Sequence, residues 1–383
     1  MTVPLDYETL RLAWWALLGL VLIGFAVMDG FDMGVAMLLP VVARGDTERR
    51  IVINSIGPVW DGNQVWLILG GGAAFAAWPP LYATAFSAFY VPLLLVLAAL
   101  ILRPVGFDYR NKVEHAAWRA AWDWALFLGG LVPTAVFGVA MGNLLVGVPF
   151  HLTPELRTVY GEGFLLHLLT PFPLLCGLVS VAMLVMHGAT YLALRTEGAV
   201  ERRARRAVWV GALTLVILFA VAGWIVATRL DGHLVVSGLP GDGPSNPLLK
   251  KVTLDRGAWL ANFIGSPWML AAPALGLIAP FVAGVLTNKR RAGWAFVASA
   301  AAVSGVVATA GLALFPFLLP SSTHPSHGLT VWDASSSPLT LFIMLVATVV
   351  VLPIVASYTV FVYRVLRGKV TAGHIETHGP HLY

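Results

Sequence analysis

The stretch that decides the fold is Trp14–Val42, which reads WWALLGLVLIGFAVMDGFDMGVAMLLPVV. It is longer than the roughly 20 apolar residues that a helix needs to cross a bilayer. Two carboxylic acids, Asp29 and Asp32, interrupt it. An aspartate at the centre of a membrane helix costs about 2.5–3.5 kcal/mol on insertion scales. We therefore expect both acids to lie inside a helix bundle and to have a function.

The composition places the whole chain in the same class. Of its 383 residues, 58% are hydrophobic and 11% are charged, whereas a soluble domain has about 25% charged residues. The first apolar run is too long for a signal peptide and lacks a basic start and a cleavage site. Cys176 is the one cysteine, which excludes an intrachain disulfide and a metal site made of cysteines alone. No phosphate-binding loop, dinucleotide motif or nucleophile elbow is present, and we expect no nucleic-acid partner.

The apolar runs predict an all-α polytopic membrane protein. A window of about 20 apolar residues per span gives nine transmembrane helices, at residues 10–42, 52–78, 80–102, 121–147, 163–194, 207–230, 258–287, 293–319 and 336–366. The second and third are divided only by Trp78-Pro79-Pro80. Proline favours the first turn of a helix and restricts the residue before it, so a tight turn is expected there.

The basic residues predict the orientation. Most of the 24 lysines and arginines fall on one side of the membrane, in residues 44–50, 103–119, 195–206, 289–291 and 364–369. Cytoplasmic loops carry the excess of lysine and arginine. We therefore predict a periplasmic N-terminus and a cytoplasmic C-terminus.

With this orientation, three acids fall at a similar depth. Asp29 and Asp32 are three residues apart and share a helix face. At 1.5 Å per residue, Asp32 and Asp61 lie about 18 and 17 Å from the cytoplasmic ends of their helices, so they could face each other across a helix hairpin. Such acids can be structural hydrogen-bonding groups, but three at one depth, beside the amide of Gln64, favour a proton path.

Small residues flank these acids at four-residue steps. Ala26, Gly30 and Gly34 form one face of the first span. Small residues at this spacing let another helix approach closely in a membrane. We therefore predict a tight helix contact along this face.

Several long motifs resemble subunit II of the cytochrome bd quinol oxidases. The most specific are WDGNQVW, residues 60–66, and RPVGFDYR, residues 103–110. Similar runs cover residues 24–38, 46–68, 75–110, 142–150, 245–263 and 315–341. The similarity extends from Asp6 to the closing Tyr383. The family also has members with glutamate at the position of Gln64. Because glutamine does not titrate, Asp61 would be the residue of this motif that carries protons here.

The resemblance implies a role in a respiratory complex of the bacterial inner membrane. That complex oxidises a membrane quinol and reduces O₂ to water with protons taken from the cytoplasm. The partner, subunit I, would hold haems b and d and the quinol-oxidation loop, and this chain would bind no haem and no metal. A structural quinone, lipid and a small single-helix subunit remain open as further partners, because some relatives bind a quinone in this subunit.

The resemblance also implies a domain organisation. Subunit II is expected to contain two four-helix bundles and a peripheral helix within one membrane domain. Residues 1–150 would form the first bundle and residues 151–320 the second. Residues 321–370 would supply the last span, and residues 371–383 a cytoplasmic tail.

Candidate site residues follow from motif and depth together. The proton-path candidates are Asp61, Asp29, Asp32 and Asp108; Asp108 could instead be a boundary acid paired with Arg103 or Arg110. Weaker candidates for a quinone or partner contact are Trp60, Gln64 and Trp66, for which plain packing is the alternative.

Two other functions compete with this one. A haem protein in its own right is disfavoured because His167 and His187 are about 30 Å apart along one helix, and paired ligation needs two converging residues; local hydrogen bonding is expected for His187. The tail histidines His374, His378 and His381 are expected to be solvated. A proton-coupled secondary transporter is the alternative function, although no pair of broken, inverted repeats is evident.

Overall fold

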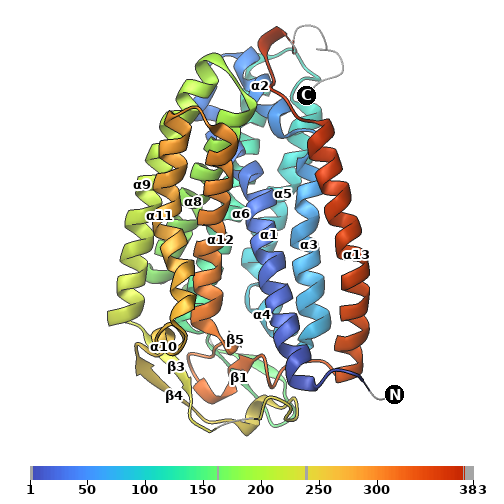
Figure 1. Cartoon of the computed structure of the whole chain (residues 1–383), viewed down its shortest axis with the longest axis vertical. Coiled ribbons are helices and arrows are strands. Elements are labelled where there is room, and N and C mark those ends of the chain that lie inside the picture. Colours follow the sequence, from blue (N-terminus) through green and yellow to red (C-terminus); the bar gives the residue numbers. More distant parts are fainter. Residues whose placement is uncertain (1–2, 162–163, 238–239, 374, 376–383) are drawn as a thin grey trace.

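The computed structural model describes residues 3–161, 164–237, 240–373 and 375, and most of them are helical (Figure 1). The long helices are α1 (Tyr7–Val42), α3 (Trp60–Ala77), α5 (Tyr90–Tyr109), α6 (Ala116–Val146), α8 (Pro171–Arg195), α9 (Gly198–Thr228), α11 (Ala271–Asn288), α12 (Ala292–Leu314) and α13 (Pro338–Val365). Shorter helices are α2 (Asp46–Ile56), α4 (Pro79–Ala88), α7 (Phe164–His167) and α10 (Ala261–Gly265), with 3₁₀ turns η1 (Pro247–Leu249), η2 (Ala258–Leu260), η3 (Pro267–Leu270) and η4 (Pro325–His327).

Short strands pair in the loops at one end of the molecule (Figure 1). They form three antiparallel pairs within the described residues: β1 (Phe150–Leu152) with β2 (Thr158–Tyr160), β3 (Asp231–Val235) with β4 (Val252–Arg256), and β5 (Phe317–Leu319) with β6 (Leu329–Thr330). These pairs satisfy backbone groups of connecting segments that cannot enter hydrocarbon unpaired.

Within the described part of the chain, eight helices are long and apolar enough to cross a bilayer. They are α1, α5, α6, α8, α9, α11 together with η3, α12 and α13. Helix α3 is not among them, because its first turns carry Asp61, Asn63 and Gln64. It nevertheless runs beside α1 and α13 (Figure 1), where the second predicted span is expected. The structure is thus the all-α polytopic membrane protein that the sequence predicts.

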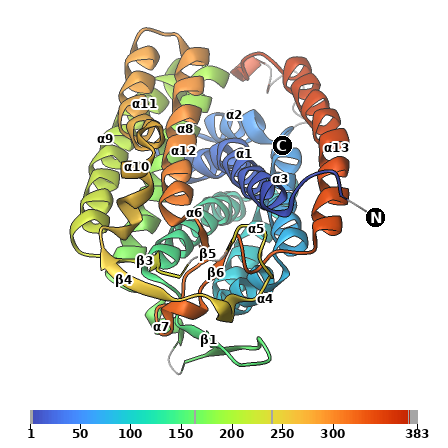
Figure 2. The same cartoon turned by 60° about the horizontal axis from the view of Figure 1, so that its bottom comes forward.

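The long helices form two groups with one helix outside them (Figure 2). Helices α8, α9, α11 and α12 each contact the next, and α12 returns to α8. In the other group α1 contacts α3 and α6, and α6 contacts α5. Both α1 and α6 pack on α8, which joins the groups, whereas α13 packs on α1 and α3 from the outer side.

Several predicted span boundaries are wrong, and proline and glycine explain most of the differences. The span predicted at 52–78 breaks at Gly57–Val59, where Pro58 lacks an N–H for the helical ladder. The predicted turn before Pro79 is confirmed, but α4 ends at Ala88 before α5 begins. Other helices start later than predicted, at Pro171 and Ala271 instead of 163 and 258, and α12 ends at Leu314 instead of 319. Three helices are longer than predicted: α5 ends at Tyr109 instead of 102, α6 starts at Ala116 instead of 121, and α9 starts at Gly198 instead of 207.

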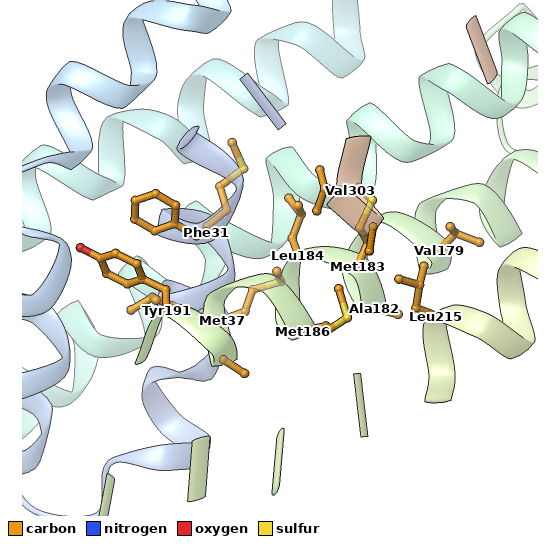
Figure 3. Packing of buried hydrophobic residues seen from close by; sticks show 14 of the residues in the cluster. Phe31, Met37, Val179, Ala182, Met183, Leu184, Met186, Tyr191, Leu215 and Val303 are labelled. Atoms are coloured by element: carbon orange, nitrogen blue, oxygen red, sulfur yellow. The ribbon is translucent and has the colours of Figure 1, made fainter. Parts of the chain in front are cut away.

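The core is closest-packed where α1 crosses α8. A Cβ on Gly34 would overlap the carbonyl oxygen of Leu184 and would lie 3.0 Å from Cα of Gly188. A Cβ on Gly30 would meet a methyl of Leu184 at 2.8 Å. The predicted close helix contact of the small-residue face is therefore confirmed. Around it, apolar side chains of both helices interdigitate, and Phe31 stacks on Tyr191 with 4.1 Å between ring centroids (Figure 3).

The end that carries the strands is held together by buried cations. Arg11 is fully buried and donates to the carbonyl oxygens of Gly241 and Gly243, 2.6 and 3.0 Å away. Lys250 forms an ion pair with Asp333 at 2.9 Å, and both side chains are buried. Burial lowers the pKa of Lys250, against the opposing effect of Asp333. These cations thus fasten loops together, instead of acting as free surface charge.

Candidate functional site

The centre of the candidate site is a buried ion pair between α1 and α5. Asp29 and Arg103 are both fully buried. The guanidinium donates twice, from Nη2 to Asp29 Oδ1 at 2.7 Å and from Nη1 to Oδ2 at 3.2 Å. Gly129 of α6 makes room for the arginine, because a Cβ there would lie 3.0 Å from Arg103 Cγ. A bidentate pair of this kind fixes both orientation and charge.

Asp32 lies beside this pair and extends the site to two more helices. Its Oδ2 is 4.0 Å from Arg103 Nη2 and accepts a hydrogen bond from Asn63 Nδ2 at 2.7 Å. Asn63 Oδ1 in turn accepts from the hydroxyl of Tyr363 at 2.8 Å. Asp32 Oδ1 is buried and has no hydrogen-bond partner among the described residues. We call Asp29, Asp32, Asn63, Arg103 and Tyr363 the polar cluster.

The polar cluster has an unbalanced charge and lies beside two aromatic side chains. Two carboxylic acids face one guanidinium, so a formal charge of −1 remains unless one acid carries a proton. Trp60 lies with its ring 5.8 Å from the Arg103 guanidinium carbon and stacks on Phe107 at 5.3 Å. A buried carboxylate oxygen without a donor is costly, and a proton on one of the two acids would remove the residual charge.

The structure does not bring Asp61 into the polar cluster. Its side chain is exposed on the outer surface of α3, and Asn63 takes the position facing Asp32. The expected pairing of Asp61 with Asp32 across the hairpin is therefore wrong. Gln64 is half-buried. Trp66 packs on α1, where a Cβ on Gly24 would be 2.8 Å from its ring.

Asp108 lies exposed at the end of α5. The arginines that were its alternative partners are engaged with other acids: Arg103 with Asp29, and Arg110 with Asp46 and Asp123. Asp108 therefore keeps an accessible carboxylate at the end of the molecule where the predicted cytoplasmic basic segments gather.

A second ionic network, absent from the sequence-based candidates, lies at that end. Arg110 is buried and pairs with Asp123 at 2.6 Å and with Asp46 at 2.9 Å. Arg49 adds a contact to Asp123 at 2.7 Å. The pKa of Glu48 is held below its ordinary value, chiefly because Arg203 hydrogen-bonds to its carboxylate. The network thus ties α2 to α5, α6 and α9.

The histidines occupy positions of different kinds. His187 is buried in α8, with Nδ1 2.8 Å from the Ser299 hydroxyl and Nε2 2.9 Å from the carbonyl oxygen of Val27. The ring of His187 is thus fully hydrogen-bonded, but its partners lie on α12 and α1, 112 and 160 residues away, so the expectation of local hydrogen bonding is wrong. His167 ends the short helix α7, outside the span in which the sequence placed it. The tail residues His374, His378 and His381 lie outside the described residues.

Comparisons with known proteins agree on one family. The model of the family "Cytochrome bd terminal oxidase subunit II" matches residues 10–366. The chain is 51% identical to cytochrome bd-I ubiquinol oxidase subunit 2 of Escherichia coli, over 99% of this chain and all of that protein. It is 32% identical to cytochrome bd ubiquinol oxidase subunit 2 of Bacillus subtilis, over 94% and 96% of the two chains.

A solved structure shares the fold. A chain in the structure of bd oxidase from Geobacillus thermodenitrificans aligns with a TM-score of 0.68 and 17% identity, over 94% of this chain and 99% of that one. At this level of identity the likeness concerns the arrangement of the helices alone.

Proposed function

Because this chain belongs to the family of cytochrome bd terminal oxidase subunit II, a multi-pass bacterial inner-membrane subunit of a respiratory quinol oxidase, we propose that it braces the haem-bearing subunit I and carries part of the cytoplasmic proton path. Family membership decides against a secondary transporter. Haems b and d and the oxidation of quinol are assigned to subunit I, and the role of this chain is structural and protonic.

The surface of α3 supports a docking face for subunit I. Asp61 shares an exposed face with Val65, Ile68 and Leu69, which are 51%, 72% and 41% exposed. The apolar residues suit either lipid or protein, but a carboxylate facing lipid at membrane depth is strongly disfavoured. A protein that covers α3 would remove this penalty. The exposed carboxylate of Asp61 is therefore the main support for this docking face, because a partner that covers α3 would have to supply polar contacts to it.

The same residue connects the two parts of the proposed function. Asp61 and Asn63 lie in the first turns of α3, with Asn63 bonded to Asp32 on the inside and Asp61 exposed on the outside. Asp108 lies at the accessible end of α5, and Arg103, five residues before it on the same helix, binds Asp29. We propose that protons enter near Asp108, are held by Asp32 beside Asp29, and reach subunit I at Asp61.

The proton path is tested by replacing Asp61 with asparagine. Asparagine keeps the shape and much of the hydrogen bonding but does not titrate. We expect the Asp61→Asn complex to assemble with full haem content and to reduce O₂ more slowly, by on the order of a hundredfold or more. Oxygen consumption by the purified complex, normalised to haem absorbance, measures this. Asp255→Asn, on an exposed strand at the other end, should leave the rate unchanged.

Normal turnover by Asp61→Asn with haems intact would place the proton path wholly in subunit I. Loss of haem together with loss of activity would instead show that Asp61 acts in docking, which separates the two parts of the proposal.

The orientation is tested with fused reporters. The basic segments predicted to be cytoplasmic gather at the end opposite the strands (Figure 1), as the positive-inside rule requires of one membrane face. A reporter active only in the periplasm should be silent when fused after Arg367 and active when inserted at Asp242. The reverse pattern would overturn the cytoplasmic entry of protons at Asp108.

A further inference from the structure

A cavity at the basic end of the second helix group has no part in the proposed proton path. Its volume is about 800 Å³, within the range of small-ligand sites. It lies where α8 runs into α9 and α11 turns into α12, and the segment after α13 reaches its rim at Lys369. That segment is held there by a hydrogen bond from Val370 N to the carbonyl oxygen of Arg195 at 2.8 Å.

The charge of this cavity is strongly one-sided. Four cationic side chains line it: Arg205, Arg290, Arg291 and Lys369. Glu201 is the acid among the described lining residues, 3.8 Å from Arg205 and 3.7 Å from Lys369. One carboxylate therefore faces four cations, and the cavity keeps a formal charge of +3 that an anionic ligand can neutralise.

Two backbone features hold cations at the cavity. Arg205 donates from Nη2 to the carbonyl oxygen of Asn288 at 2.9 Å, which bridges α9 to the end of α11. Arg290 adopts the left-handed conformation, with φ of 56°, in the turn between α11 and α12. Glycine accepts this conformation without strain, whereas arginine does not. An arginine kept at this position therefore points to a function for its side chain at the cavity.

The membrane side of the cavity is apolar. Trp294 and Val297, on the first turns of α12, line it and are 67% and 55% exposed. Below them, the outer face of α11 presents further exposed apolar residues, namely Ile278, Phe281, Val282 and Val285. Tryptophan is enriched at the level of lipid headgroups. The cavity thus joins a cationic pocket to an apolar surface at one membrane boundary.

We propose that this cavity binds the headgroup of an anionic phospholipid. The phosphate would accept hydrogen bonds from Arg290, Arg291 and Lys369, and the acyl chains would lie along Trp294 and α11. Basic pockets between membrane helices are known to take such headgroups. A soluble phosphate compound shares the chemistry of the phosphate, but it gains nothing from the apolar rim, which favours the lipid.

The test measures lipid binding to the purified, detergent-solubilised oxidase complex by native mass spectrometry. Phosphatidylglycerol and phosphatidylcholine with the same acyl chains are compared, and inorganic phosphate is the soluble competitor. We expect phosphatidylglycerol to bind more tightly. The double variant Arg290→Gln, Arg291→Gln should weaken phosphatidylglycerol binding by about 30-fold, since each cation near a membrane surface contributes about fivefold. Phosphatidylcholine binding should not change.

The matched control removes two arginines at the same end but outside the cavity. Arg202→Gln, Arg206→Gln on α9, whose side chains are exposed, should change binding less than twofold. The conservative double variant Arg290→Lys, Arg291→Lys should keep most of the phosphatidylglycerol binding. Equal losses of phosphatidylglycerol binding in the two double variants would contradict the location of the site. Displacement of phosphatidylglycerol by millimolar inorganic phosphate would contradict the assignment of the ligand as a lipid.

If the double variant does not assemble, a second measurement on the unaltered complex still tests the proposal. Phosphatidylglycerol, and not phosphatidylcholine, should slow hydrogen–deuterium exchange in residues 288–297. Exchange in this turn that does not respond to phosphatidylglycerol would contradict the proposal, whatever the variants do. The result does not depend on the proton path, because none of the cavity residues belongs to the polar cluster.

Discussion

Replacing Gly34 with leucine is expected to abolish assembly of the oxidase complex and the haem spectrum that depends on it. A side chain at this position would enter the backbone of α8 at Leu184 and Gly188, where no rotamer change can relieve the overlap. Overpacking a core costs about 1–3 kcal/mol when side chains can adjust, and a backbone clash should exceed that range. The difference spectrum of membranes and co-purification of subunit I measure the loss.

Two further substitutions calibrate this result. Gly30→Leu should be milder, because the new atom meets the end of the flexible Leu184 side chain. Gly223→Leu should be neutral, since nothing lies within 4 Å of a Cβ there, on the outer face of α9. Normal haem content in Gly34→Leu membranes would mean that α1 and α8 are not in backbone contact in the complex.

Replacing Arg103 with glutamine should cost about 3–5 kcal/mol of stability, because it leaves the buried acids of the polar cluster without their cation. Arg103 gives Asp29 two hydrogen bonds and lies 4.0 Å from Asp32. We expect a much lower yield of assembled complex and a lower melting temperature of the remainder. Thermal unfolding of the purified complex, followed through the loss of haem absorbance, measures the difference.

A double variant distinguishes lost charge balance from lost packing. Asp29→Asn combined with Arg103→Gln removes one charge of each sign and keeps two groups that can hydrogen-bond to each other. Removing both members of a buried ion pair is far less costly than removing one, so the double variant should recover most of the stability. A double variant as unstable as Arg103→Gln alone would show that the shape of the arginine, and not its charge, is required.

Much of the membrane architecture could be predicted from the sequence, because hydrophobic length and basic loops are averaged over many residues. The depths of Asp29 and Asp32 and the small-residue face followed from one helix that is continuous in the structure. Arg103 was assigned to a cytoplasmic segment, although it is buried in α5. Two features of the sequence could have corrected this. Arg103 directly follows an apolar run, and the first span contains two acids, Asp29 and Asp32, that need a cation.

The direction in which the Asp61 side chain points could not be predicted, because it depends on a break in the helix. The prediction assumed one helix through residues 52–78, and the chain instead breaks at Gly57–Val59. A break of a few residues rotates everything after it about the helix axis, so Asn63 faces α1 and Asp61 faces outward. The long-range partner Tyr363, 300 residues from Asn63, leaves no local trace in the sequence.

The outer position of α13 has a consequence for how the chain matures. Synthesis proceeds from the N-terminus, so α13 follows the other long helices of the described residues, and it joins α1 and α3 from outside. Tyr363 donates to Asn63, and the segment behind it binds the end of α8 through Val370. The hydrogen-bond chain from Asp32 is therefore completed only after α13 has been synthesised. A nascent chain that stops before α13 would insert the earlier long helices but would leave Asn63 without its bond from Tyr363.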